Sequence, residues 1–115
     1  EAALKHDPRF VPAHHARGVA LKGLKRLTEA AAAFQHVTTL EPRHADAWMQ
    51  RGNVALALND PAALGHYQHV LEIQPNNADA WSNHGVALSM LRRHAEALQS
   101  YQRAIDLQPA LADAH

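Results

Sequence analysis

Residues 80–109 read AWSNHGVALSMLRRHAEALQSYQRAIDLQP, and the rest of the chain is built from near-copies of this stretch. A shift of 33 residues towards the N-terminus places Gly85 on Gly52, and a further shift of 34 places Gly52 on Gly18. A residue set that returns every 33 to 34 residues is typical of a solenoid of stacked helical pairs. The sequence therefore predicts an all-α repeat architecture.

The stretch itself predicts two amphipathic helices. Trp81, Gly85 and Leu88 share one face of the first helix, and a second apolar stripe runs through Tyr101 and ends at Pro109. Only a tight turn fits between the two stripes, so we expect the helices to lie antiparallel. Neither helix can bury its stripe alone, and each pair must therefore pack against the next pair.

Each unit has a glycine in its first helix and a large ring in its second. A glycine inside a helix costs roughly 1 kcal/mol relative to alanine, so a packing role is expected. We predict that the missing side chain allows the partner helix to approach closely, and that the ring fills the adjoining space. The glycines are Gly18, Gly52 and Gly85, and the rings are Phe34, Tyr67 and Tyr101.

The repeats divide the chain into five segments of one continuous domain. They are the end of a preceding repeat (1–10), repeat one (11–44), repeat two (45–77), repeat three (78–111) and the start of a truncated fourth repeat (112–115). In repeat one we expect helices near 12–25 and 28–41. Repeat two is one residue short at Asn59-Asp60-Pro61, where Asp60 can cap the next helix and Pro61 can open it.

The charge balance excludes several partner classes. Eleven Lys and Arg residues match eleven Asp and Glu residues, whereas a general nucleic-acid binder carries a basic surplus. The same neutrality removes attraction to an anionic membrane surface, and no apolar run approaches the length of a membrane span. We therefore expect neither nucleic acid nor a membrane as a partner. The compartment stays open, with the cytoplasm favoured.

Catalytic and metal chemistry find little support. The chain has no cysteine, and it lacks a nucleophile motif and a glycine-rich loop after a strand. Among its ten histidines, His66 and His69 share a predicted helical face with Glu72. A metal site also needs supporting groups that hold its ligands, and none is visible here. We expect solvated histidines, no metal, no cofactor and no enzymatic activity.

The recurring residues resemble the tetratricopeptide repeat. That family has an aromatic residue near the start of the first helix, then glycine, alanine, an aromatic residue, a small residue and a closing proline. These positions are Trp48, Gly52, Ala63, Tyr67, Val70 and Pro75 in repeat two, and Trp81, Gly85, Ala97, Tyr101, Ala104 and Pro109 in repeat three. Repeat one supplies Gly18, Ala30, Phe34, Val37 and Pro42, with His14 in the tryptophan slot. The resemblance covers essentially the whole chain and implies a right-handed superhelix of antiparallel helix pairs.

The residues before the three glycines depart from the family pattern, as do Leu21, Ala55 and Leu88, which stand where an aromatic residue is usual. Arg17, Arg51 and His84 precede the glycines, where leucine is usual. We expect these side chains to be half-exposed, with the arginine stems lying on apolar surface.

The resemblance also implies a concave groove, lined by the first helices, that holds an extended peptide or a partner helix. Methionine and leucine would give it an adaptable apolar floor, and its amides could bond a peptide backbone. The implied groove residues are His15, Val19, Lys22, Asp46, Met49, Gln50, Asn53, Leu56, Asp79, Ser82, Asn83, Val86, Ser89 and Met90.

The favoured function is a non-catalytic scaffold, of bacterial type, that binds a protein or peptide partner. One alternative is the repeat arm of a larger enzyme that resembles the O-linked N-acetylglucosamine transferases, whose arrays carry a similar ADAW motif with groove asparagines. Only Asn83 fits that asparagine slot. The other alternative is self-assembly, because Leu98, Tyr101 and Ile105 would lack the cover of a following repeat.

One subtype of the family clamps the C-terminal carboxylate of chaperones with groove lysine, asparagine and arginine. The corresponding places hold His15, Val19, Gln50, Asp79 and Asn83. We therefore predict that this chain is not a chaperone-tail clamp.

Overall fold

The computed structural model describes residues 10–107 of the 115-residue chain. That range contains six helices and no strand: α2 (Phe10–Gly23), α3 (Leu27–Leu40), α4 (Ala45–Ala57), α5 (Ala63–Ile73), α6 (Ala78–Met90) and α7 (His94–Leu107). The predicted partial repeats at 1–10 and 112–115 lie outside the described residues, except for Phe10, at which α2 begins.

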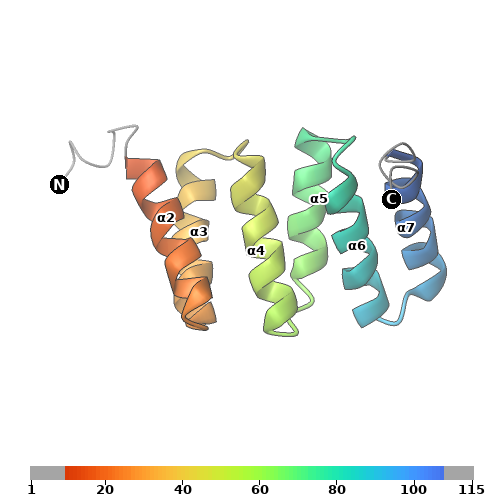
Figure 1. Cartoon of the computed structure of the whole chain (residues 1–115), viewed down its shortest axis with the longest axis horizontal. Coiled ribbons are helices and arrows are strands. Elements are labelled where there is room, and N and C mark those ends of the chain that lie inside the picture. The colour runs from red at the N-terminus through yellow and green to blue at the C-terminus, as the bar shows by residue number, and fades with distance from the viewer. Residues whose placement is uncertain (1–9, 108–115) are drawn as a thin grey trace, which may run out of the picture.

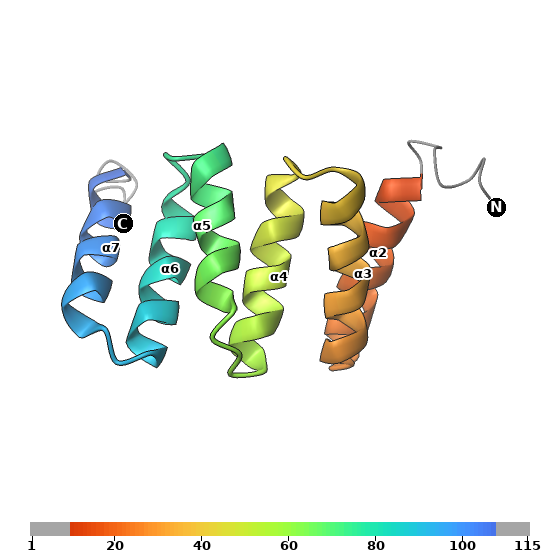
Figure 2. The same ribbon diagram turned by 180° about the vertical axis from the view of Figure 1, so that it is seen from behind.

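The helices stand in one row from α2 to α7, along a molecule 48 Å long (Figure 1). Each helix packs against the next along the chain, and α4 also contacts α6. In Figure 1, α2 lies in front of α3 and α6 in front of α5, and the view from behind reverses this order (Figure 2). The predicted all-α solenoid of antiparallel pairs is confirmed.

The predicted layers of glycine and ring do meet. A Cβ atom placed on Gly52 would lie 2.5 Å from Cε1 of Tyr67. The corresponding distances are 2.7 Å from Gly18 to the Phe34 ring and 2.8 Å from Gly85 to the Tyr101 ring. Each ring therefore rests directly on a helix backbone, at a position that leaves no room for a side chain.

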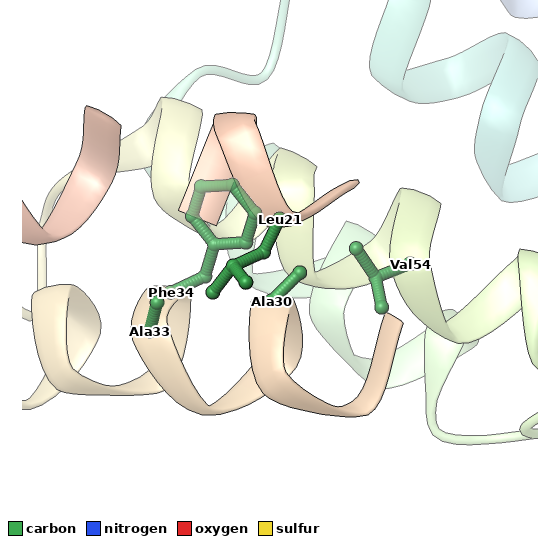
Figure 3. Close-up of a cluster of buried hydrophobic side chains, with 5 residues drawn as sticks. All are labelled: Leu21, Ala30, Ala33, Phe34 and Val54. Atoms are coloured by element: carbon green, nitrogen blue, oxygen red, sulfur yellow. The ribbon is translucent and has the colours of Figure 1, made fainter. Parts of the chain in front are cut away.

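The core continues from one helical pair into the next. Leu21 of α2 packs with Ala30, Ala33 and Phe34 of α3, and Val54 of α4 completes this buried cluster (Figure 3). Phe34 and Val54 are fully buried. Because the cluster draws on both pairs, burial in this fold depends on stacking, as the repeat pattern predicts.

The turns inside the pairs share one design. Lys25, Asn59 and Arg92 adopt left-handed backbone conformations, with φ of 65°, 57° and 66°. In each turn the next residue's N–H bonds back to a carbonyl five residues earlier, as in Arg26 N to Leu21 O at 2.9 Å. This pattern is a Schellman C-cap, which satisfies carbonyl groups at the end of the first helix.

The missing residue of repeat two shortens α5. This helix has 11 residues, whereas α3 and α7 have 14 each. Asp60 Oδ1 accepts a hydrogen bond from Ala62 N at 2.9 Å within the turn, but the N-cap of α5 is Ala62 and no side chain caps the helix, so the prediction that Asp60 caps it is wrong. Pro61 lies in the turn before α5 and does not open the helix, which corrects the prediction for that residue.

Candidate functional site

The fourteen residues of the implied groove all lie on α2, α4 and α6, and none of them is buried. We call this set the first-helix face. Positions three or four apart share a side of a helix, so the members of the set on each helix lie on one side of it. The most exposed apolar members are Val19 and Val86, whose residues are 44% and 41% accessible to solvent.

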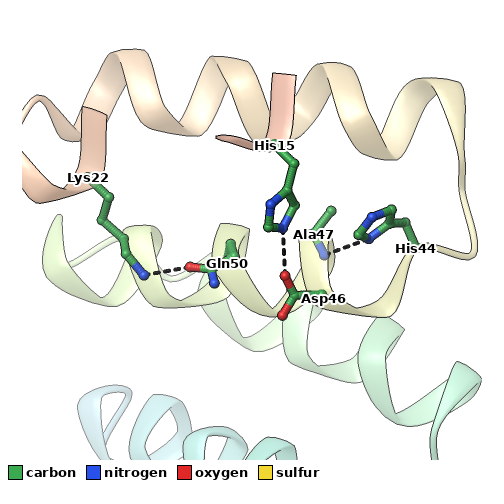
Figure 4. Close-up of polar contacts among 6 residues, drawn as sticks. All are labelled: His15, Lys22, His44, Asp46, Ala47 and Gln50. Atoms are coloured by element: carbon green, nitrogen blue, oxygen red, sulfur yellow. Dashed lines mark hydrogen bonds and ion pairs between the residues drawn. The ribbon is translucent and has the colours of Figure 1, made fainter. Parts of the chain in front are cut away.

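Two polar contacts join α2 to α4 on this face (Figure 4). His15 Nε2 donates to Asp46 Oδ2 at 2.5 Å. Lys22 Nζ donates to Gln50 Oε1, also at 2.5 Å. These contacts hold four of the predicted residues in fixed positions, but they also occupy hydrogen-bonding atoms that a ligand would otherwise use.

Asn53 is the centre of a second set of contacts, between α4, α5 and α6. Its Oδ1 accepts from Tyr67 Oη at 2.6 Å and from Asn83 Nδ2 at 3.3 Å. Asn83 Nδ2 also lies 3.6 Å from Met49 Sδ. Burial raises the pKa of Tyr67, so its phenol stays protonated and acts as the donor. This role of Tyr67 was not predicted from the sequence. Its hydroxyl, which Phe34 lacks at the equivalent position, could have indicated a hydrogen bond.

The apolar part of the face belongs partly to the core. Met49 and Leu56 pack against a buried cluster formed by Ala55, Tyr67 and other residues. Their side chains are half-buried. Met49 and Leu56, the apolar floor that the resemblance implies, are therefore anchored by packing against the core.

At one end of the face, His15 and Asp46 border a hollow of about 390 Å³. The His15 ring stacks on His44, with centroids 5.3 Å apart. His44 Nδ1 in turn accepts from Ala47 N at 3.1 Å and caps α4 (Figure 4). Asn77 fills the equivalent position before α6 and accepts from Ala80 N at 3.0 Å. The turns that precede α4 and α6 are therefore closed by different side chains.

The two histidines on α5, His66 and His69, lie against Trp48 and form no metal-binding group with other described residues. The His69 ring stacks on the Trp48 indole at 4.0 Å, and the His66 ring lies 5.8 Å from the same indole. Burial, with a smaller contribution from Arg51, lowers the pKa of His66 to about 4. His66 is half-buried, so the prediction of a solvated ring is wrong at this position. Across residues 10–107, no group of three or more His, Cys, Asp or Glu residues could hold a metal ion.

The residues that precede the glycines differ in burial. Arg17 is exposed, whereas Arg51 and His84 are half-buried. The Arg51 guanidinium lies 4.8 Å from the centre of the Trp48 ring and donates to Thr38 Oγ1 at 3.1 Å. His14, in the tryptophan slot, is half-buried as well, and its ring stacks on His36.

Comparison with known families agrees with this geometry. Sequence profiles described as tetratricopeptide repeat match residues 15–63 and 66–99, which together make up most of the chain. The chain belongs to the tetratricopeptide repeat family. No curated protein matches its sequence. Such repeats are in general interaction modules that present extended binding surfaces and carry no catalytic chemistry of their own.

Solved structures show the same fold. A crystal structure of MamA matches with a TM-score of 0.84 and 22% identity, over 90% of this chain and 61% of that one. The MamA RS-1 ArsTM double mutant matches with a TM-score of 0.83 and 27% identity, over 90% and 59% of the two chains. The chain thus spans about three fifths of these relatives.

The first tetratricopeptide domain of Spaghetti (RPAP3), bound to the HSP90 peptide SRMEEVD, matches with a TM-score of 0.85. It is 19% identical to this chain, and the match covers 90% of this chain and 82% of that one. That protein therefore binds a peptide on the same fold.

In the part of the chain that the structure describes, no helix is long and apolar enough to cross a membrane.

Proposed function

We propose that the chain is a protein-interaction scaffold that binds an extended peptide or a partner helix in a concave groove along α2, α4 and α6. The observation that supports this proposal is that the fourteen residues are unburied on α2, α4 and α6, helices joined by the contacts His15–Asp46, Lys22–Gln50 and Asn53–Asn83. The peptide bound to the related fold of RPAP3 supports the same class of function. The proposed repeats are 11–44, 45–77 and 78–111.

The contacts within the face suggest how a ligand would be held. Val19 and Val86 present exposed apolar surface. The side chains of Asn83 and Gln50 are already positioned by contacts to Asn53 and Lys22. A face that is ordered before binding loses less side-chain entropy when a ligand arrives.

The test uses a substitution that leaves the internal contacts intact. Val86→Glu places a charge on exposed apolar surface, and Gln68→Glu, at an exposed position of α5, is the matched control. In a pull-down with the protein carrying this domain, we expect Val86→Glu to lose captured partners and Gln68→Glu to keep them. Equal capture by both variants would refute the groove. Asn53→Ala is less suitable, because Asn53 also holds Tyr67.

A peptide ending in EEVD distinguishes the subtype. We expect no micromolar binding, because the corresponding places hold no lysine or arginine and Asp79 adds an acid among them. Tight binding of this peptide in a calorimetric titration would contradict the prediction.

Self-association is a second candidate, supported by Leu98 and Ile105 on α7, which are 69% and 59% exposed. Analytical ultracentrifugation should then show dimers or larger species as the concentration rises, and a monomer at high concentration would oppose it. The arm of a larger enzyme remains the other alternative, which a glycosyltransferase domain in the same protein would favour.

A further inference from the structure

A hollow of about 320 Å³ opens beside Trp81, between α6 and α7. Its lining residues are Trp81, His84 and Leu88 of α6 and Glu96, Gln99, Ser100 and Arg103 of α7. None of these residues belongs to the first-helix face. We call this feature the Trp81 hollow.

Repeat two shows what can occupy the corresponding place. Trp48 is the counterpart of Trp81, and in repeat two this indole is covered by imidazole rings. The His69 ring stacks on it at 4.0 Å with an interplanar angle of 15°, and the His66 ring lies 5.8 Å away. Repeat two has a hollow of about 250 Å³ nearby, but Trp48 does not line it.

Repeat three carries smaller or non-aromatic residues in the two histidine slots. Ser100 stands for His66 and Arg103 stands for His69, since both pairs are 34 residues apart. Ser100 is almost fully buried and shares a hydrogen bond of 2.8 Å with His84 Nδ1. The guanidinium of Arg103 lies 5.6 Å from the centre of the Trp81 ring. Trp81 therefore lacks the stacked ring that Trp48 has.

Hydrogen bonds hold two of the lining residues, Trp81 and His84, in place. Trp81 Nε1 donates to Pro75 O at 2.8 Å, as Trp48 Nε1 does to Pro42 O. Burial lowers the pKa of His84, which keeps its ring uncharged at neutral pH. Arg103 is exposed and has no carboxylate partner among residues 10–107, so it can move aside and flank an incoming ring. An indole face beside an exposed guanidinium favours a planar aromatic group.

We propose that the Trp81 hollow binds an aromatic side chain of a partner protein, which stacks on Trp81 as His69 stacks on Trp48. This site lies outside the proposed groove, so one chain would offer two separate contacts to its partners. The proposal does not depend on the groove, because no residue of the first-helix face lines the hollow.

The first experiment follows the indole N–H resonances of the two tryptophans by NMR during titration with N-acetyltryptophanamide, a capped aromatic side chain. We expect a saturable shift of the Trp81 signal and at least about a threefold weaker response to cyclohexanol, which is similar in size to a ring but lacks a π face. A linear response, or equal binding of cyclohexanol, would overturn the proposal. Binding of free indole without binding of the capped amino acid would overturn the assignment to a partner side chain.

The second experiment exchanges the residues of the two repeats. Ser100→His combined with Arg103→His should fill the hollow and weaken N-acetyltryptophanamide binding at Trp81 by about tenfold or more, a loss of about 1.4 kcal/mol. The reciprocal variant, His66→Ser with His69→Arg, should create a saturable site at Trp48. Circular dichroism checks that each variant is folded. Unchanged binding in the first folded variant, or no new site in the second, counts against the proposal.

Discussion

Repeats two and three are built on the same frame but filled differently. In repeat two, Tyr67 is fully buried and bonded to Asn53, and the Trp48 indole is covered by His69. In repeat three, Tyr101 is only half-buried. The comparison teaches that the glycine–ring layer is common to both repeats, while packing of a following helix decides how deeply the ring is buried. Helix α6 packs on α5 and covers Tyr67, whereas α7 is the last described helix.

The start of the second helix differs as well. Arg93 makes two hydrogen bonds of 2.8 Å to Glu96 at the start of α7, and Arg26 pairs with Glu29 in the same way in α3. The shortened repeat two has no such pair, and Asp60 bonds within its turn instead. Exposed ion pairs of this kind contribute little to stability, which explains why one repeat tolerates the loss.

Gly52→Ala should have the largest effect on stability and should test the difference between repeats two and three. The new Cβ would meet the fully buried Tyr67 ring at 2.5 Å, so overpacking outweighs the gain in helix propensity. We expect a loss of about 2 kcal/mol in the free energy of unfolding, measured with urea. Gly85→Ala should cost less, because the half-buried Tyr101 ring has room to shift.

Gly65→Ala is the control for that experiment. It lies in α5, and a Cβ there would meet nothing within 4 Å. We expect it to stabilise the protein by up to about 1 kcal/mol. If Gly52→Ala were as harmless as Gly65→Ala, the layer of glycine and ring would not be the frame of the fold.

Tyr67→Phe should have an intermediate effect. It removes the 2.6 Å hydrogen bond to Asn53 Oδ1, which still accepts from Asn83. We expect a loss of about 1 kcal/mol in thermal or urea unfolding. Tyr101→Phe removes no hydrogen bond within the described residues and should change stability little. Equal losses of stability in Tyr67→Phe and Tyr101→Phe would show that the hydrogen bond of Tyr67 does not make repeat two more stable than repeat three.

His66→Gln should have the smallest effect, visible as a change in the pH dependence of stability. The pKa of His66 falls to about 4 in the folded state, below the ordinary value of 6.5, so folding favours the neutral ring. Its contribution is complete above pH 6.5 and is lost as the pH falls towards 4. Because the ring is only half-buried, we expect no more than about 1 kcal/mol over this range.

Thermal unfolding of His66→Gln and the parent protein at a series of pH values measures that difference. The variant should show a flatter decline on acidification. Part of the slope should persist, because burial also lowers the pKa values of His14 and His84. An identical slope in both proteins would show that the His66 ring titrates alike in the folded and unfolded states.

The fold was predictable from sequence because its causes are local and repeated. The returning glycines and rings predicted the helical pairs, their order and the layer in which Gly52 meets Tyr67, since a position without a side chain can be read directly from the letters. Helix limits were less accurate: α2 begins and ends two residues earlier than expected, because its end depends on a left-handed residue at Lys25.

The candidate site was predictable only as a set of positions. The resemblance to the tetratricopeptide repeat implied its fourteen residues, which lie on α2, α4 and α6. It gave no information on the bonds between them, such as Lys22 to Gln50, because those partners lie 28 residues apart and meet only after the helices stack.

The sequence by itself therefore determined the repeat, the pairing of the helices and the contact of each glycine with a ring, because these follow from side-chain size at fixed intervals. Packing between the pairs settled which polar atoms are already bonded, as at Asn53, and which histidines are shielded from water, as at His66. It also left the hollow beside Trp81, because burial and hydrogen bonding depend on neighbours that the chain brings together only when it folds.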